Sequence, residues 1–426
     1  MTTQQDRVGA PATAAGPGRA RRRHAARREG FLAAHRRRVR ARRARRAARR
    51  TPFGRHPFRT AAALAIVGLT PVWWSLGSAL ENPSFGISIP ARLAEWVRDH
   101  GGAGIVVWGE NLWYSHHAPK VGGTPPKGAI PVVHRPLPPP HPGTVGLPPP
   151  APLRPFASPP LPGEGRWRPA GRLVDGIPAV YETELRPDAL HTSYVVGVAW
   201  MDTKLLRASL YSGSYIPGGG PWPLTAPIEP AAARTLVAAF NAGFRLQDSQ
   251  GGYYTDHRMV APLRPGAASF VIYRDGAATV GEWGRDVRMT PSVVAVRQNL
   301  SLLVDHGRPV PGLQANDTSR WGFTLGNQVY VWRSGVGVTA DGALVYVGGP
   351  GLNITDLAAL LARAGCLRAM ELDINTDWVN FATFDPGPHQ LASPANGTDL
   401  LPDMAASPAR YFASWWTRDF FTMSAR

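Results

Sequence analysis

The sequence contains a single cysteine, Cys366, among its 426 residues. One cysteine excludes an intrachain disulfide and any metal site that needs several cysteine thiolates. Cys366 follows a helical pattern and opens an apolar stretch, so we interpret it as a small core residue and not as a nucleophile. The lack of disulfides is compatible with a location outside the cytoplasm, because many exported bacterial proteins have none.

Acidic residues are nearly absent from the first 59 residues, which hold one Asp, one Glu and no Lys against 19 Arg. This region therefore carries a net +17 of the chain's +18, and the remaining chain is almost neutral. We predict that residues 1–57 form a disordered, basic cytoplasmic tail. Its arginines suit anionic lipid headgroups, whereas a nucleic-acid partner is not expected for the nearly neutral body.

Long hydrophobic runs are also scarce, and only one is long enough to cross a bilayer. Residues 60–80 contain no charged side chain, and about 20 apolar residues span the hydrocarbon core of a membrane. We therefore predict a transmembrane signal anchor over residues 58–80. Arginines crowd only its N-terminal side, which predicts a single-pass plasma-membrane protein with a cytoplasmic N-terminus and an extracytoplasmic body. The alternatives are a buried core helix and a cleaved signal peptide.

Two segments connect this anchor to the rest of the chain. Residues 81–118 form a predicted juxtamembrane segment with an amphipathic helix at Ile89–Val97 and a strand at residues 105–108. Residues 119–163 form a Pro-rich linker, with 17 prolines in 45 residues. Polyproline II rises about 3.1 Å per residue, so this composition predicts a semi-rigid spacer. A disordered tether is the alternative.

The remaining residues, 164–417, alternate short β-rich runs with turns and contain few helical patterns. Residues 268–273 and 302–305 are typical strand candidates. The clearest helical spacing lies at residues 353–364, where every third or fourth residue is leucine or another apolar residue. We predict one α+β domain with a mixed β-sheet and few helices.

The strongest signal for chemistry lies between residues 329 and 381, which read as strand, arginine, strand, helix and strand. Arg333 follows a β-rich run and precedes Ser334 and Gly335. We predict that Arg333 ends a strand and presents its guanidinium to an anion; a structural salt bridge is the alternative. The last strand, at residues 367–372, ends on polar residues, and ligands bind beyond the carboxyl ends of strands joined by crossover helices.

Glu371, Asp373 and Asn375 alternate at the end of that strand and are predicted to share one face. The two carboxylates would lie roughly 7 Å apart, a separation suited to an acid and a base in glycosyl transfer. Burial and repulsion would raise the pKa of one, giving a protonated acid beside an ionised base. The alternatives are a hard cation held by these oxygens and a solvated strand end.

Other polar candidates are less specific. Asn241 closes an apolar strand shortly before Gly243 and is either a turn residue or an amide that faces a ligand. His257 lies in a loop with two tyrosines that could line a sugar site, although a lone loop histidine is more often solvated. Residues 297–299 could bind a polar ligand or cap a turn. The sequence has no P-loop, dinucleotide fingerprint, His-Glu-x-x-His site or nucleophile elbow.

Taken together, these motifs resemble the phosphodiester glycosidase domain, the family of the lysosomal uncovering enzyme. The shared order covers residues 195–384: Phe-Asn-Ala-Gly-Phe, Gly-Gly-Tyr-Tyr, Arg-Ser-Gly-Val-Gly-Val, an Asp-Gly turn, a short helix and Leu-Asp. Asn241 matches the Asn of the family's Asn-Gly-Gly-Phe-Phe motif, Arg333 its Arg, and Asp373 the Asp of Leu-Asp-Gly-Gly-Gly-Ser. Residues 374–378 replace those glycines, which predicts a reshaped pocket wall.

The resemblance implies a glycoside hydrolase that cleaves a sugar-1-phosphodiester or a related glycan of the cell envelope. The sequence itself requires no cofactor, and a hard cation near Asp373 is the alternative. Arg333 would hold the phosphate, Asp373 and Glu371 would transfer protons, and Asn241 and Asn375 would bind sugar hydroxyls. One alternative is a catalytically inactive family member that binds a cell-envelope polymer. Another is a protein whose basic tail acts on nucleic acid or anionic lipid while the domain is a scaffold.

Overall fold

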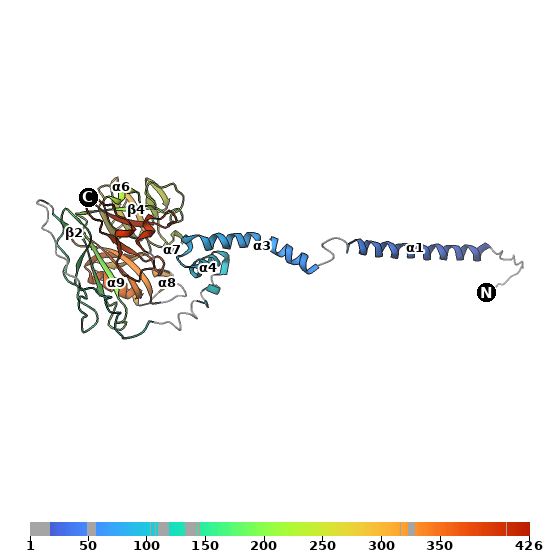
Figure 1. Ribbon diagram of the computed structural model, residues 1–426, viewed down its shortest axis with the longest axis horizontal. Coiled ribbons are helices and arrows are strands. Elements are labelled where there is room, and N and C mark those ends of the chain that lie inside the picture. Colours follow the sequence, from blue (N-terminus) through green and yellow to red (C-terminus); the bar gives the residue numbers. More distant parts are fainter. Residues whose placement is uncertain are drawn as a thin grey trace, which may run out of the picture. The chain divides into compact units, whose positions relative to one another are not determined.

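The structure is a computed structural model that describes residues 18–48, 57–102, 104–106, 108–109, 119–132, 143, 145–315, 317–322, 329–405 and 407–426. The chain forms two compact units, Met1–Ser75 and Leu76–Arg426. Helices dominate the first unit, and strands dominate the second (Figure 1).

The N-terminal unit contains helix α1 (Gly18–Ala48) and most of helix α3 (Pro57–Glu81). Disorder was predicted for the tail, but residues 18–48 are helical, because Arg and Ala are both strong helix formers. Helix α3 covers the predicted anchor. Among the described residues it is the one helix long and apolar enough, by length and composition, to cross a membrane.

The juxtamembrane segment lies near the start of the C-terminal unit. It contains a 3-10 turn, η1 (Pro83–Phe85), then helix α4 (Ile89–Val97) and the π-turn η2 (Arg98–Gly102). Helix α4 has the predicted bounds and is capped by the Ser88 side chain, which accepts from the Ala91 N–H. The predicted strand at residues 105–108 is wrong, since residues 104–106 and 108–109 are helical. No described strand lies beside them to pair with.

The described parts of the Pro-rich segment lie against the domain and do not form the predicted free spacer. Leu147, Leu153 and Ala157 are buried. The Leu147 N–H donates to the Asp202 carboxylate at 2.6 Å, and the Leu153 N–H donates to the Gly165 carbonyl at 2.8 Å. Apolar residues between the prolines therefore fasten this segment to the domain surface.

Three antiparallel sheets build the domain, which confirms a mostly β fold with few helices. The predicted mixing of parallel and antiparallel strands is wrong for the described strands, whose pairings are all antiparallel. The central sheet has the order β1-β2-β3-β14-β13-β15-β11-β12. Its strands are β1 Arg168–Val174, β2 Ile177–Leu185, β3 Val196–Met201, β11 Leu302–Asp305, β12 Arg308–Pro309, β13 Val331–Thr339, β14 Leu344–Leu352 and β15 Cys366–Glu371.

Two five-stranded sheets complete the domain, with the orders β17-β16-β5-β18-β4 and β7-β6-β10-β8-β9. The first contains β4 Leu206–Tyr211, β5 Leu236–Asn241, β16 Phe381–Phe384, β17 Gly397–Asp399 and β18 Phe420–Ala425. The second contains β6 Tyr253–Thr255, β7 Arg258–Ala261, β8 Ala268–Tyr273, β9 Ala278–Glu282 and β10 Val293–Gln298. Phe240, Phe270 and Phe421 pack together in the core that these sheets share.

The domain extends past the predicted end at residue 417, because β18 lies between β5 and β4 and is part of the core. Helix α9 (Ile354–Arg363) packs on the central sheet. The remaining helical elements are short: α6 Pro230–Ala233, α7 Leu246–Ser249, α8 Thr318–Trp321, η3 Leu313–Ala315, η5 Pro394–Asn396 and η6 Pro408–Phe412.

Helix α9 links β14 to β15 across β13, so β14 and β15 run in the same direction on either side of it. Asn353 caps α9 through its side chain, which accepts from the Asp356 N–H, and the helix falls within the predicted residues 353–364. Strand β13 does not stop at Arg333 as predicted but continues to Thr339. Gly335 and Gly337 are needed for close packing: a Cβ would lie 2.9 Å from Leu361 Cδ1 and 2.5 Å from Cys366 Sγ, respectively.

Candidate functional site

Four of the six predicted site residues meet where β5, β13 and β15 come together. The register pairs Gly335 of β13 with Glu371 of β15. Beyond the end of β15, the Ser334 N–H donates to the Asp373 carbonyl at 2.9 Å. The Ser334 hydroxyl lies 3.2 Å from the Asp373 N and accepts from the Asn241 amide at 3.1 Å. Ser334 therefore joins the three strands, and Arg333 precedes it.

The first charged pair of this cluster is Arg333 with Glu371. Arg333 Nη1 donates to Glu371 Oε1 at 2.7 Å, and its Nε donates to the Leu352 carbonyl. Burial raises the pKa of Glu371 to about 7; Arg333 opposes this shift and Asp373 adds to it. Glu371 Oε2 is buried and has no hydrogen-bond partner among the described residues. Arg333 thus neutralises an internal carboxylate, and its role as a phosphate holder is not supported by this geometry.

The second charged pair is Asp373 with Arg418, which enters from the residues before β18. Arg418 Nη2 donates to Asp373 Oδ2 at 3.0 Å, and the Ile374 N–H donates to Oδ1 at 2.8 Å. Arg418 also lies over the Trp378 ring, 4.0 Å from its centroid. Burial raises the pKa of Asp373 to about 6, against the effect of Arg418. A carboxyl with this pKa can give or take a proton near neutral pH.

The Asn241 side chain connects residues of the cluster through hydrogen bonds. Its amide nitrogen donates to Ser334 Oγ and to the Ala242 carbonyl, and its oxygen accepts from the Tyr346 hydroxyl at 2.9 Å and the Asn380 N–H at 3.0 Å. Two donors and two acceptor positions are the full capacity of an amide. Asn241 therefore positions its neighbours and has no remaining capacity for the sugar hydroxyls assigned to it from the sequence.

Arg297 and Asp419 form a third buried pair. Arg297 Nε donates to Asp419 Oδ2 at 2.7 Å, and both side chains are inaccessible to solvent. Asn299, two residues further along, donates to the carbonyls of Glu371 and Leu372 at 2.9 Å each. Residues 297–299 thus hold the backbone that carries the candidate acids, which is closer to the capping alternative than to ligand binding.

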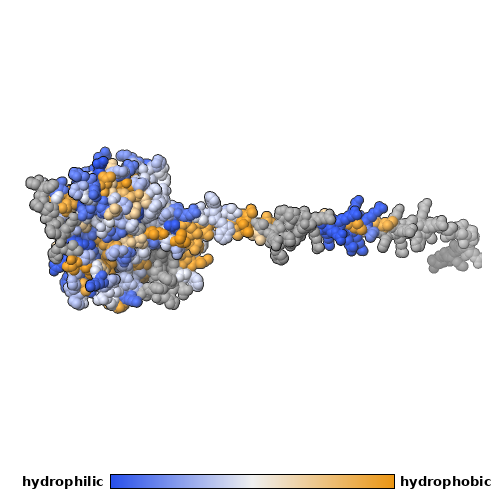
Figure 2. Space-filling view, in the orientation of Figure 1, coloured by the Kyte–Doolittle hydropathy of each residue, from blue (hydrophilic) through white to orange (hydrophobic). Residues whose placement is uncertain are grey.

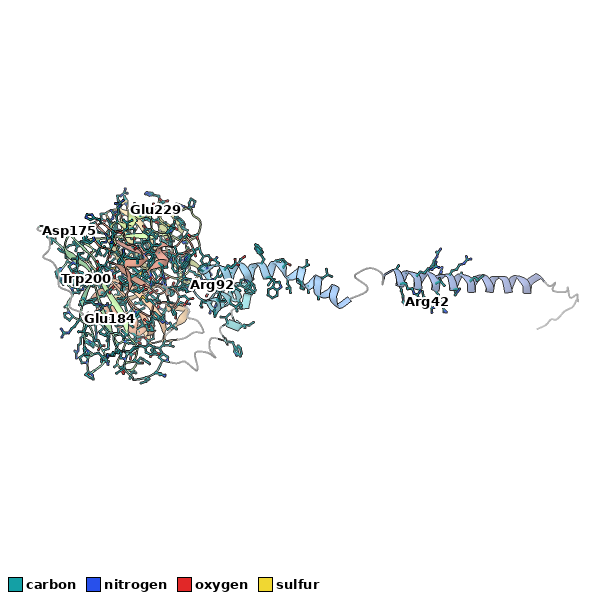
Figure 3. All side chains as sticks on the ribbon, viewed as in Figure 1. Arg42, Arg92, Asp175, Glu184, Trp200 and Glu229 are labelled. Atoms are coloured by element: carbon teal, nitrogen blue, oxygen red, sulfur yellow. The ribbon has the colours of Figure 1, made fainter. Side chains whose placement is uncertain are left out.

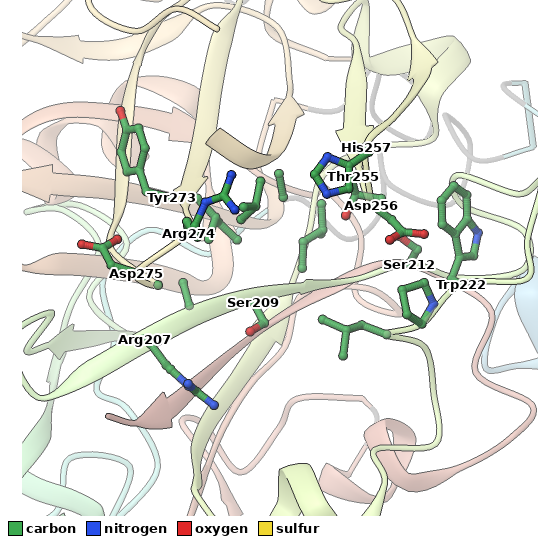
Figure 4. A pocket seen from close by; sticks show the side chains of 18 residues that line it. Arg207, Ser209, Ser212, Trp222, Thr255, Asp256, His257, Tyr273, Arg274 and Asp275 are labelled. Atoms are coloured by element: carbon green, nitrogen blue, oxygen red, sulfur yellow. The ribbon is translucent and has the colours of Figure 1, made fainter. Parts of the chain in front are cut away.

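Asn375 and His257 do not join the cluster. The Asn375 side chain accepts from the Asp377 N–H at 2.9 Å and so caps the turn after Asp373. His257 lies at the tip of the β6–β7 hairpin with a φ of 56°, on the rim of a separate cleft of about 320 Å³. Figure 4 shows His257 and Asp256 across this cleft from Arg207 and Ser209 on β4. The proposed sugar contact through His257 would therefore belong to another site.

The segment that replaces the family's glycines is partly explained by packing. Ile374 is buried with Phe244 and Leu300 in a small apolar cluster. Among the residues that the structure describes, no group of three or more His, Cys, Asp or Glu side chains is arranged to hold a metal ion. Both Asp373 oxygens already accept N–H groups, so the cation alternative gains no support from them.

Sequence reasoning missed Arg418, the cation nearest to Asp373. The two residues are 45 positions apart, and only the pairing of β18 with β5 and β4 brings them together. The local signal was an Arg-Asp pair directly before the β-rich residues 420–423 at the end of the chain.

Comparison with known proteins agrees with the motifs. Residues 234–373, about a third of the chain, match the family model of the phosphodiester glycosidase domain, which confirms the predicted resemblance over these residues. None of the curated proteins matches the chain significantly.

Among solved structures, the zebrafish N-acetylglucosamine-1-phosphodiester alpha-N-acetylglucosaminidase catalytic domain, auto-inhibited by its pro-peptide, is similar at 15% identity and a TM-score of 0.37. The alignment covers 61% of this chain and 88% of that one. A hypothetical protein from Synechocystis is similar at 12% identity and a TM-score of 0.32, covering 61% and 64%. The family match supports a glycosidase-type hydrolase in general terms.

Proposed function

We propose that the chain is a membrane-anchored, extracytoplasmic glycoside hydrolase that cleaves a sugar-1-phosphodiester or a related cell-envelope glycan. The observation that carries this proposal is the pair of Asp373 and Arg418. Asp373 occupies the position of the family's motif Asp, its pKa is raised to about 6 by burial, and a guanidinium lies 3.0 Å away. The Asp373 carboxyl can accept or donate a proton, and the Arg418 guanidinium can bind an anion.

In the proposed reaction, water bonds to the anomeric carbon while the bond from that carbon to the phosphate oxygen breaks. Asp373 takes the proton of the attacking water. Arg418 binds the departing phosphate through its planar fork of N–H groups, which match phosphate oxygens. The phosphate leaves as an anion and needs little protonation. The products are a free sugar and a phosphate monoester.

Glu371 and Arg333 have a supporting part in this proposal. Arg333 keeps Glu371 in place at 2.7 Å, and Glu371 lies two residues before Asp373 with its own pKa raised to about 7 by burial. The protonation state of Glu371 changes the field at Asp373. We assign these two residues to positioning and to tuning the pKa of Asp373, with no direct substrate contact.

The location outside the cytoplasm rests on the sequence and on helix α3. Within α3, residues Leu64–Glu81 form an apolar stretch of 18 residues, and arginines are concentrated on its N-terminal side. A single-pass plasma-membrane anchor with a cytoplasmic N-terminus follows from the positive-inside rule. Anionic headgroups of the cytoplasmic leaflet are then the expected partners of the basic helix α1.

A second candidate function is a catalytically inactive domain that binds a cell-envelope polymer. Two observations favour it. Ile374 stands where the family has a glycine and is packed into an apolar cluster, and Asp373 is only 5% exposed. A site with so little accessible surface needs a rearrangement before a substrate can reach the carboxyl.

The test uses the full chain in lipid nanodiscs with two sets of substrates that differ only in the leaving group. One set carries methyl phosphate on the anomeric oxygen of common hexoses and N-acetylhexosamines, and the other carries methyl alone. We expect free sugar from at least one phosphodiester and none from the matching methyl glycoside. Binding of a phosphodiester by calorimetry without turnover would select the inactive alternative. The absence of both binding and turnover would overturn the proposal.

A further inference from the structure

The segment from Asn82 to Asp99, called the neck here, is clamped to the end of helix α3. Arg92 of α4 makes the clamp: Nη1 donates to the Leu80 carbonyl at 2.7 Å, Nε to the Gly86 carbonyl at 2.7 Å and Nη2 to the Ile87 carbonyl at 3.3 Å. Figure 3 labels Arg92 on this segment. One guanidinium therefore fixes α4 to the last turn of the apolar helix.

The neck is also fixed to the domain, beside the candidate site. The Ile87 N–H donates to Asp377 Oδ2 at 3.1 Å, and the Phe85 ring lies 5.9 Å from the Tyr215 ring. Burial raises the pKa of Asp377, and the Ile87 N–H, Arg410 and Arg418 oppose this shift. Asp377 therefore lies within electrostatic reach of the cation that pairs with Asp373.

Helix α4 shows the reverse of the polarity expected for a helix packed on a soluble domain. Its charged residue Glu95 faces the domain and pairs with Arg245 at 3.0 Å. Its apolar residues Ile89 and Leu93, one helical turn apart, are 55% and 43% exposed. A surface helix in water normally turns its apolar stripe inward.

The helical residues after the neck continue this apolar surface. Ile105 and Trp108 are 72% and 68% exposed. Figure 2 shows apolar side chains gathered on the part of the domain where Figure 1 places α4. Four large apolar side chains thus lie exposed within 30 residues of the C-terminal end of α3.

We propose that α4 and residues 104–106 and 108–109 lie in the outer interface of the lipid bilayer and hold the candidate site next to the membrane surface. The bilayer is the occupant because α3 would leave the membrane at Glu81 and Arg92 ties α4 to that exit. Amphipathic helices at this depth bury their apolar side among headgroups and acyl chains and keep their polar side in water. The polar side of α4 is the one that faces the domain.

This position names a substrate class and rests on the proposed function. A site at the bilayer surface suits a phosphodiester whose sugar is the group released and whose other alcohol is a membrane lipid. Water adds to the anomeric carbon, the bond from that carbon to the phosphate oxygen breaks, and the phosphate monoester stays on the lipid. A substrate held in the same membrane is presented at high effective concentration.

The first experiment tests the membrane contact without using activity. Single cysteines are introduced as Ile89→Cys, Leu93→Cys and, as a control, Leu190→Cys, which is 61% exposed elsewhere on the domain. The native Cys366 is buried and burial raises the pKa of its thiol, so it does not compete for the label. Each full chain carries an environment-sensitive fluorophore and is placed in nanodiscs that contain spin-labelled lipid.

We expect lipid quenching at positions 89 and 93 and none at 190. Equal quenching at all three positions, or at none, overturns the proposal. Quenching at none together with oxidative cross-linking of Leu93→Cys between two chains would instead assign this surface to a second copy.

The second experiment separates this inference from the proposed function. Ile89→Ser with Leu93→Ser removes the apolar pair while leaving the core intact, because both side chains are exposed. We expect about tenfold slower release of sugar from a lipid-linked phosphodiester in the same nanodisc, and an unchanged rate on the methyl phosphodiester. If the variant and the native chain release sugar from the lipid-linked substrate at the same rate, the membrane role is overturned. If neither substrate releases sugar with the native chain, the proposed function is overturned, and the quenching result alone then tests the membrane contact.

Discussion

The central sheet contains two buried carboxyls that look alike by their chemistry and differ in their surroundings. Glu371 on β15 pairs with Arg333 at 2.7 Å, and Glu182 on β2 pairs with Arg168 at 3.3 Å. Burial raises the pKa of each glutamate to about 7. By these measures alone, either one would be a candidate acid.

Their neighbours separate them. Arg168 is shared with a second glutamate, Glu184, so this group is an ion-pair network between β1 and β2. Glu371 instead lies two residues from Asp373, which has its own cation in Arg418. A shifted pKa therefore marks burial alone, and we base the proposed site on the second carboxyl and second cation that converge on the same strand end. The predictions below use the β2 glutamate and other distant residues as controls for this distinction.

The largest expected effect belongs to Asp373→Asn. This change removes the proposed proton-transferring group and preserves the shape, so we expect the rate of phosphodiester hydrolysis to fall by about a thousandfold. Asp356→Asn is the matched control, because burial also raises the pKa of Asp356 to about 6 although it lies on α9. The measurement is the initial rate of sugar release by the full chain in nanodiscs. Native-like turnover in Asp373→Asn would remove this residue from the mechanism.

The next effect is on stability, and here both regions should behave alike. The pKa values of Glu371 and Glu182 rise from 4.5 to about 7 on folding, so the folded state binds their protons more tightly. Their contribution to stability is complete below pH 4.5 and is lost as pH rises toward 7. We expect the free energy of unfolding to fall between pH 5 and pH 8 by on the order of 2 kcal/mol for each carboxyl.

Urea unfolding followed by tryptophan fluorescence at the two pH values measures this difference. Glu371→Gln and Glu182→Gln should each flatten the pH dependence by a similar amount. If only one of the two variants changed the pH dependence of the free energy of unfolding, the two glutamates would not be equally buried, contrary to the structure.

Local sequence patterns predicted several of the helices and strands correctly. Helix α4, strands β8 and β11 and the capped helix α9 depend on periodicity and capping, which a single sequence displays. Strand β13 was predicted to end at Arg333, where the β-rich run is followed by the small residues Ser334 and Gly335. In this fold Gly335 and Gly337 make room for Leu361 and Cys366, and only the packed structure reveals that need.

The candidate site divides in the same way. Glu371 and Asp373 were predicted from their alternation, which is a local property, although β15 ends at Glu371 and Asp373 lies just beyond it. Arg418 was missed because its approach to Asp373 depends on β18 inserting between β5 and β4. The role first given to Asn241 also changed, since the adjacent Ala242 carbonyl and three partners from distant segments use its whole hydrogen-bonding capacity.

A smaller effect distinguishes the two glutamates in activity. Glu371→Gln should slow hydrolysis about tenfold, because Arg333 then lacks its counter-charge and the field at Asp373 changes. Glu182→Gln, with the same isosteric change and the same loss of a buried carboxylate, should leave the rate unchanged. Initial rates of both variants on the methyl phosphodiester make the comparison. Equal slowing in both would mean that the activity responds to stability and not to the site.

The smallest effect is a shift in the pH dependence of the activity that remains when Arg418, the proposed phosphate-binding group, is replaced. Arg418 holds the pKa of Asp373 below the value that burial alone would give, so Arg418→Gln should raise that pKa by roughly one unit. If ionised Asp373 is the base, the acid limb of kcat/KM moves to higher pH by the same amount. Arg363→Gln is the control, because Arg363 also lies over an aromatic ring, 3.7 Å from the Phe156 centroid, but on α9. A limb that stays in place in Arg418→Gln, or moves equally in both variants, would mean that the cation next to Asp373 does not set its protonation.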